Sequence, residues 1–303
     1  MANEGSKSLG IDTAHILRRD ERYQDDITML ARTNGVQLYY TDEGAGLPLV
    51  VHHGGPGFDH TSIAPFLRDL AGEMRLVCFD HRGTGRSSHP EEGDGYDIGD
   101  FVDDVEGLRR HLGVEGFAML GHSFGGMVAL HYVLAHPERL SHLLLVCTAA
   151  SHEFLREGTE NMRRGVGPEV WLELERIAQG PPSAENMKRA FMLQAPVFFR
   201  DPSMISALDL DNVRWGPASQ AAWQYLARFD LRGWLCRIRV PTLVIAGRHD
   251  LAVPLCHSEE MAQLIPGAHL AVSESSAHFP YIEDRGWFLQ TVRRFLLGEK
   301  EAP

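Results

Sequence analysis

One serine in this 303-residue sequence stands between two glycines at the spacing that nucleophilic catalysis requires. Residues 121–125 read Gly-His-Ser-Phe-Gly, follow the apolar run FAML and precede the helix-like GMVALHYVLAHP. A serine at such a strand-to-helix turn exposes its Oγ at the edge of a sheet, and the glycines let neighbouring chains pass close by. The N-terminus of the following helix favours developing negative charge. Ser123 is therefore the predicted nucleophile.

A serine hydroxyl needs a base to remove its proton and a carboxylate to orient that base. Such partners follow the nucleophile in the order Asp, His, each in a loop at the carboxyl end of a strand. Asp250 ends the strand-like VIAGRHD, and His278 lies in the loop SAHFP after HLAVSES. His269 falls inside a strand-like run and His257 inside a helix-like one, so both are expected to be structural or surface groups.

Residues 53–57, His-Gly-Gly-Pro-Gly, follow the apolar run PLVVH and predict a site for a negatively charged oxygen. Acyl hydrolysis passes through a tetrahedral oxyanion, which two preset backbone N–H groups stabilise. Gly55 and Phe124, the residue after the nucleophile, are the predicted donors. Glycines keep side chains away from these donors, and Pro56 stiffens the turn.

Two further stretches suggest other kinds of site but have the wrong spacing for them. His52, His53, Asp59 and His60 do not match H-x-H-x-D-H, and the sequence contains neither H-E-x-x-H nor a paired-cysteine motif. No metal is therefore predicted. Residues 80–87, DHRGTGRS, lack the spacings of phosphate-binding loops and are expected to brace the active-site loops.

Strand-like and helix-like segments alternate along the chain around these residues. Residues 27–42 form two β-rich runs joined by Asn34-Gly35, which predicts an antiparallel hairpin at a sheet edge. Short apolar runs then alternate with helix-like stretches up to residue 150, and again from residue 240 or so. This βαβ alternation predicts an α/β fold with a parallel sheet covered on both faces.

Residues 151–230 interrupt the alternation. They are rich in helix formers, Met, Trp and Phe, and glycine or proline breaks fall at 167–168, 180–182 and 216–217. We expect an inserted helical cap over the carboxyl edge of the sheet, with residues 1–150 and 231–303 as the core domain. A separate domain in tandem is the alternative, but the strands on both sides are expected to belong to one sheet.

The composition of the chain indicates which classes of partner and which cellular location to expect. A net charge of -12 and a pI near 5.7 oppose binding to nucleic acid, which requires a basic face. The first thirty residues hold no apolar block typical of a signal peptide, and no later run is long enough for a membrane span. Of the four cysteines, at 78, 147, 236 and 256, the first two fall in strand-like runs and are expected to be buried, which favours a cytoplasmic protein.

The motifs HGGPG, DHRGTGRS, GHSFGG, GRHD and SAHFP, in this order, resemble the α/β-hydrolase superfamily, most closely its proline iminopeptidase group. The resemblance covers residues 27–150 and 240–297. It implies a mostly parallel eight-stranded sheet, the triad Ser123, Asp250 and His278, and no cofactor. Typical proline iminopeptidases are similar to G-G-S-W-G at the nucleophile, whereas His122 and Phe124 stand at the variable positions here, as in many esterases and lactonases.

The predicted function is hydrolysis of an ester, lactone or amide bond of a small molecule through an acyl-enzyme on Ser123. Proline iminopeptidase, carboxylesterase and acyl-homoserine lactonase activities stay open, as does homo-oligomerisation. Ser123 argues against the aspartate nucleophile of epoxide and haloalkane hydrolases, and a non-catalytic small-molecule receptor is the remote alternative. Six glutamates of the predicted cap offer partners for a free amine, although a solvated helix face explains them equally well: Glu153, Glu157, Glu160, Glu169, Glu173 and Glu175.

Overall fold

A computed structural model describes residues 29–90, 95–180, 183–214 and 216–298. The chain begins there with the hairpin β1 (Leu30–Thr33) and β2 (Val36–Glu43). Asn34 and Gly35 connect the two strands with φ angles of 45° and 76°, as the tight turn predicted for this dipeptide requires. The hairpin is confirmed, while residues 27–28 of the predicted run and most of the segment searched for a signal peptide lie outside the described residues.

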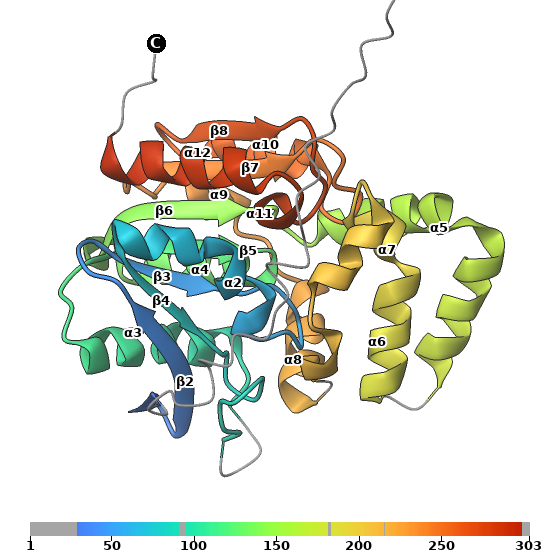
Figure 1. Cartoon of the computed structure of the whole chain (residues 1–303), viewed down its shortest axis with the longest axis horizontal. Helices are drawn as coiled ribbons and strands as arrows, with labels where there is room; N and C mark the ends of the chain where they lie inside the picture. The colour runs from blue at the N-terminus through green and yellow to red at the C-terminus, as the bar shows by residue number, and fades with distance from the viewer. Residues whose placement is uncertain (1–28, 91–94, 181–182, 215, 299–303) are drawn as a thin grey trace, which may run out of the picture.

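The sheet has eight strands in the order β1-β2-β4-β3-β5-β6-β7-β8 (Figure 1). Pairing is antiparallel in the β1–β2 and β2–β4 pairs and parallel in the others. The predicted mostly parallel sheet with an antiparallel edge is thus confirmed. The remaining strands are β3 (Pro48–His52), β4 (Arg75–Phe79), β5 (Phe117–His122), β6 (Leu140–Val146), β7 (Thr242–Gly247) and β8 (His269–Ser273).

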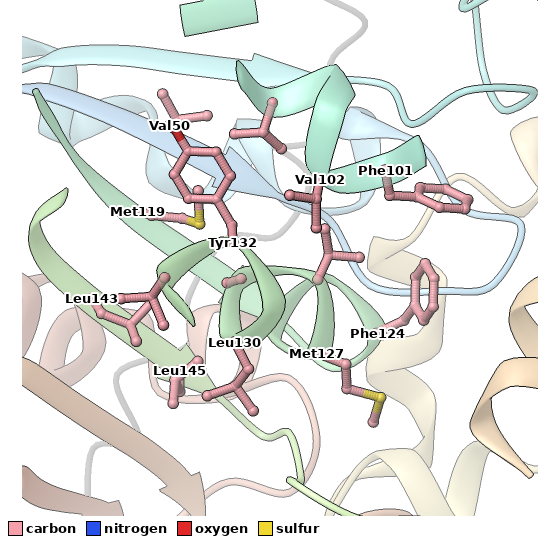
Figure 2. Packing of buried hydrophobic residues seen from close by; sticks show 14 of the residues in the cluster. Val50, Phe101, Val102, Met119, Phe124, Met127, Leu130, Tyr132, Leu143 and Leu145 are labelled. Carbon is pink, nitrogen blue, oxygen red and sulfur yellow. The ribbon is translucent and has the colours of Figure 1, made fainter. Parts of the chain in front are cut away.

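Two buried clusters cover the two faces of the sheet. Alternate residues of one strand enter different clusters: Val50 belongs to one, whereas Leu49 and Val51 belong to the other. The first cluster includes α3 (Ile98–Leu112), α4 (Phe124–Ala135) and α10 (Leu255–Leu264), and the second includes α2 (Ala64–Leu67), α11 (Pro280–Glu283) and α12 (Arg285–Leu297). Figure 2 shows Leu130 and Tyr132 of α4 gathered with side chains of the neighbouring strands. Burial on both faces explains the continuous apolar strand runs.

The segment after β3 is more broken than its apolar pattern predicts. The predicted alternation requires one helix-like stretch here, but the structure has three short pieces, η2 (His60–Ser62), α2 and η3 (Arg68–Gly72). Pro65 stands in the first turn of α2 and has no N–H to continue a helix from residue 61. A proline that starts one helix therefore ends the preceding one.

A long helical segment separates β6 from β7, although these two strands pair directly with each other. Its main helix, α5 (Glu153–Gln179), kinks at Gly167 (φ 79°) beside Pro168. In Figure 1 α5 to α8 stand together beside the sheet, on the side toward which the β6 arrow points. The other elements are α6 (Ala184–Leu193), α7 (Ala195–Phe198), η5 (Pro202–Ala207), η6 (Leu210–Asn212), α8 (Pro217–Leu226) and α9 (Arg232–Leu235), and η4 (Pro137–Arg139) precedes β6.

The division into a core and a cap domain stays a prediction, although the breaks at 167–168 and 216–217 coincide with the α5 kink and the start of α8. Among the described helices, none combines the length and apolar character needed to cross a bilayer.

Candidate active site

Ser123 lies at the turn from β5 into α4, in a backbone conformation that a residue with a side chain rarely adopts. Its φ and ψ are 52° and -119°. The Ser123 N–H donates to Val146 O at 2.9 Å, and Thr148 Oγ1 donates to Ser123 O at 2.7 Å, so the end of β6 holds the turn on both sides. Strain of this kind persists where surrounding bonds determine the conformation.

Three glycines make the turn possible because neighbouring atoms occupy the space of their missing side chains. A Cβ on Gly121 would lie 2.5 Å from Gly125 O, and one on Gly125 would lie 2.5 Å from His53 O. A Cβ on Gly54 would lie 2.5 Å from His122 Nδ1. These positions explain in steric terms why glycine brackets the serine and recurs in the loop after β3.

His278 and Asp250 come together from loops 28 residues apart in the chain. Nδ1 of His278 and Oδ2 of Asp250 are 2.8 Å apart, and both side chains are buried. Asp250 Oδ1 accepts the N–H groups of Ala252 and Val253, each at 2.9 Å, which fixes the carboxylate. Within the described residues no hydrogen bond joins Ser123 Oγ to His278, although both side chains line one cavity.

The loop that carries His278 is fastened to the helical segment by backbone bonds. The His278 N–H donates to Phe198 O at 3.0 Å. Glu283 accepts the N–H of Ala277 and the N–H of Arg200, both at 2.7 Å. Burial raises the pKa of Glu283, and these hydrogen bonds oppose that shift. The position of the histidine therefore depends on the segment between β6 and β7.

Cys147, directly after β6, also lies against this loop. It has φ 45°, and its thiol approaches Ala277 O at 3.7 Å. Burial, followed by the nearby Asp250 carboxylate, raises the pKa of Cys147 well above its usual value. The thiol therefore stays protonated, and both Cys147 and Cys78 are buried as expected.

The loop after β3 lies on the same cavity as Ser123, and both predicted oxyanion donors, Gly55 and Phe124, are in its lining. His53 braces this loop: its Nδ1 is 2.6 Å from Gly54 O, and its Nε2 accepts the N–H of His81 at 3.1 Å. Nδ1 therefore carries the ring proton. Burial lowers the pKa of His53 to about 4, which keeps the ring neutral.

The 80–87 loop has the bracing contacts expected of it. Asp80 accepts the N–H of His60 and of Arg86, both at 2.8 Å, and its Oδ1 lies 2.6 Å from His60 Nδ1. The buried Arg82 guanidinium forms two bonds of 2.6 Å to Asp104. Asp59, His60 and Asp80 have donor atoms close enough for a metal ion, but these bonds already occupy the Asp80 oxygens.

His122, which precedes Ser123, is buried between the loops that carry Gly54 and His278. Its Nε2 is 2.9 Å from His278 O, and its Nδ1 is 3.2 Å from the Tyr281 hydroxyl. The carbonyl can only accept, so Nε2–H donates and Nδ1 accepts from Tyr281. Burial lowers the pKa of His122 well below its usual value. This neutral side chain positions the His278 backbone, a role that the sequence pattern did not indicate.

A cavity of about 830 Å³ extends from Ser123 and His278 into the helical segment. Most of its lining side chains are apolar, and Trp171, Met187 and Trp223 come from α5, α6 and α8 respectively. In the lining formed by described residues, Glu175 is the one side chain among Asp, Glu, Lys and Arg, and its Oε1 accepts the Trp171 Nε1–H at 2.7 Å. The sequence indicated helices here but not which faces meet the cavity.

Comparison with known proteins agrees with this architecture. Residues 48–285 match the family model of the alpha/beta hydrolase fold. A proline iminopeptidase of Lactiplantibacillus plantarum is 29% identical over 87% of this chain and 98% of its own. A putative carbamate hydrolase, RutD, of Azorhizobium caulinodans is 31% identical over 82% of this chain and 90% of its own. The solved structure of an esterase from Exiguobacterium antarcticum has 27% identity and a TM-score of 0.72, covering 89% of this chain and 99% of that one.

The fold and the relatives place the chain among the serine hydrolases that act on small molecules. The chain belongs to the α/β-hydrolase fold family.

Proposed function

We propose that Ser123, His278 and Asp250 form the catalytic triad. His278 Nε2 takes the proton of the Ser123 hydroxyl as Oγ attacks the substrate carbonyl, and returns it to the leaving group. Asp250, bound to Nδ1, holds the ring so that Nε2 faces the cavity and stabilises the imidazolium. Water then cleaves the acyl-enzyme by the same route. Contact between Oγ and Nε2 forms as substrate binds, because catalytic hydrogen bonds are often long before then.

The backbone N–H groups of Gly55 and Phe124 are the proposed oxyanion donors. Phe124 is the first residue of α4, where N–H groups lack partners within the helix. Gly55, with φ 158°, contributes no side chain that would block access to the cavity. Two fixed donors at this point stabilise the tetrahedral intermediate by about 3 kcal/mol or more each, judged from removal of a single such donor.

The proposed substrate is an ester with an apolar acyl or alcohol part. The observation that carries this proposal is the cavity of about 830 Å³, lined mainly by apolar side chains and continuous with Ser123. Burial of apolar ligand surface there contributes about 25 cal/mol for each Å² removed from water. The residues of 151–230 act in this proposal as a cap that selects the substrate, and 1–150 with 231–303 act as the catalytic domain.

Removal of an N-terminal proline is the second candidate, and Glu175 is the observation that favours it. Its carboxylate lies in the cavity lining and is the one acidic group there among the described residues that a free amine could meet. The relative from L. plantarum is named a proline iminopeptidase. A free amine also requires desolvation, which a single exposed carboxylate bonded to Trp171 offsets poorly.

A substrate panel separates the two candidates. We expect kcat/KM to rise from nitrophenyl acetate to nitrophenyl octanoate and to exceed that for proline naphthylamide, with acyl-homoserine lactones included as cyclic esters. Glu175→Gln leaves ester turnover unchanged if the first proposal is right and abolishes turnover of proline naphthylamide if the second is right. Turnover of the prolyl substrate alone would refute ester hydrolysis.

A cytoplasmic location and the absence of a nucleic-acid partner are part of this proposal. They rest on the buried thiols and on the net charge of -12.

A further inference from the structure

A second group of reactive side chains lies outside the proposed catalytic centre, where α5 meets α10. Glu157 is in the second turn of α5, and Cys256 and His257 begin α10. Glu157 Oε2 lies 3.5 Å from Cys256 Sγ and 3.2 Å from His257 Nε2. The three donor atoms lie within 4.8 Å of one another, with His257 buried, Glu157 half-buried and Cys256 exposed.

These separations match the edges of a tetrahedral zinc site. Zinc binds sulfur at about 2.3 Å and nitrogen or carboxylate oxygen at about 2.0–2.2 Å, which places neighbouring S and O ligands about 3.6 Å apart and N and O ligands about 3.4 Å apart. The observed separations are 3.5 Å and 3.2 Å. A thiol, an imidazole and a carboxylate that already converge to these distances need little movement to share one ion.

We propose that Glu157, Cys256 and His257 bind a thiophilic divalent cation of the Zn²⁺ type, with solvent as the fourth ligand. In the structure the Cys256 thiol donates to the carboxylate, so it carries its proton. The cation replaces that proton, which leaves to solvent. His257 Nε2 also donates a proton to the carboxylate, and this proton is exchanged through solvent for one on Nδ1, so that Nε2 can bind the cation. Arg156, which forms an ion pair with Glu157, approaches Oε1 at 4.0 Å, and its side chain is 75% exposed. It therefore leaves the binding oxygen accessible.

The site would link the helical segment between β6 and β7 to the core, beside the loop that carries Asp250. Gly158, the neighbour of Glu157, packs so closely that a Cβ there would lie 2.5 Å from Ala252 O. The Phe154 ring, one turn earlier, contacts the His257 ring edge-on at 6.5 Å and lines the substrate cavity. A cation that links α5 to α10 thus stabilises one wall of the cavity without contacting the reacting atoms.

Calorimetric titration of the full chain with Zn²⁺, after treatment with EDTA and under reducing conditions, tests the proposal. We expect one ion for each chain, and an affinity lowered at least about tenfold by Cys256→Ala or Glu157→Gln. Cys236→Ala is the matched control, because Cys236 is also an exposed thiol but lies outside the cluster, and it leaves the affinity unchanged. Cobalt bound to the wild-type protein shows a thiolate charge-transfer band that Cys256→Ala removes.

Three results would overturn the site: no binding by the wild-type protein, equal affinity of the Cys256→Ala variant, or binding that persists in that variant and is lost in His278→Ala. The last result would place the ion at Cys147, Asp250 and His278, whose donor atoms also lie within 4.8 Å of one another. Thermal unfolding in EDTA provides the folding control, since replacement of an exposed thiol should not change Tm there. With Zn²⁺ added, Tm rises for the wild-type protein and Cys236→Ala but not for Cys256→Ala.

Discussion

The helix that follows Ser123 and the helices that line the cavity differ in how deeply they are buried. Nine of the twelve residues of α4 are buried, and seven of these nine belong to one hydrophobic cluster of the core. In α5 only Phe154, Gly158 and Leu174 of 27 residues are buried, and α6 has no buried residue. Core packing therefore restricts the residues of α4, whereas α5 and α6 can vary at their exposed positions.

This contrast separates chemistry from selectivity. The groups proposed to break the bond lie on strand ends and on α4, where glycine positions and buried hydrogen bonds allow one arrangement. The groups that would choose the substrate lie on α5, α6 and α8. Substitutions in the first region should change turnover of every substrate, and substitutions in the second should change the preference among substrates.

The largest effect is expected from His278→Ala, which removes the proposed base. Turnover of all substrates should fall by about 10⁴-fold or more, with the fold retained. His269→Ala is the matched control, because His269 is exposed on β8 and is not in the lining of the cavity that contains Ser123. Measured kcat for the esters decides the point, and near-normal turnover by His278→Ala would remove this residue from the mechanism.

Gly125→Ala tests whether the tightly packed turn at Ser123 can accommodate an added methyl group. Its Cβ would lie 2.5 Å from His53 O and 2.7 Å from His52 Cβ, so we expect a loss of about 1–3 kcal/mol in the free energy of unfolding. Gly99→Ala, in a helical position with no atom within 4 Å of the new Cβ, should be neutral or stabilising by about 0.5–1 kcal/mol. Urea unfolding measures the free energy of unfolding of both variants. Equal values for Gly125→Ala and Gly99→Ala would contradict the close packing described for the turn at Ser123.

Acid should lower the free energy of unfolding because histidines are buried in the core. Burial, with His53 as a second cause, lowers the pKa of His52 to about 3, and neither ring nitrogen of His52 has a hydrogen-bond partner among the residues that the structure describes. Below about pH 6.5 the His52 ring therefore binds a proton in the unfolded chain but stays neutral in the folded chain. The contribution of this neutral ring to the free energy of unfolding is present above about pH 6.5 and is lost as the pH falls toward 3.

Between about pH 7 and about pH 5 this one ring costs about 2 kcal/mol of unfolding free energy. His52→Leu should remove that share of the loss, whereas His269→Ala should retain it. Urea unfolding at both pH values measures the difference. If wild type and His52→Leu lose stability in parallel, the neutral buried ring is not the cause.

The smallest effect is expected on the cavity side. Trp223 is 43% exposed and lines the cavity, and Trp234 is 51% exposed and does not. Trp223→Ala should raise KM for nitrophenyl octanoate by about tenfold through lost apolar contact, with kcat for the acetate unchanged. Trp234→Ala should change neither value. A fall in kcat for all esters with Trp223→Ala would mean that the two regions are not separable.

Structure could be predicted from the sequence where it is determined by residues close together in the chain. The strand runs, the Asn34-Gly35 turn and the strand–serine–helix context each require particular residues at fixed spacing, so the fold and the loops at the sheet edge could be expected. Cavity faces of α5, α6 and α8 could not, because a half-exposed helix with apolar and charged residues shows no single face. Glu283 and the Glu157–His257 pair were also missed, since their partners lie 6 to 100 residues away without a motif.

Covalent labelling distinguishes an activated Ser123 nucleophile from an ordinary serine. A fluorophosphonate should modify the wild-type protein at one site, in the peptide that contains Ser123, and should leave Ser123→Ala unlabelled when intact mass is measured. Labelling of His278→Ala should be much slower. An unlabelled wild-type protein, or equal labelling of wild type and Ser123→Ala, would contradict the account.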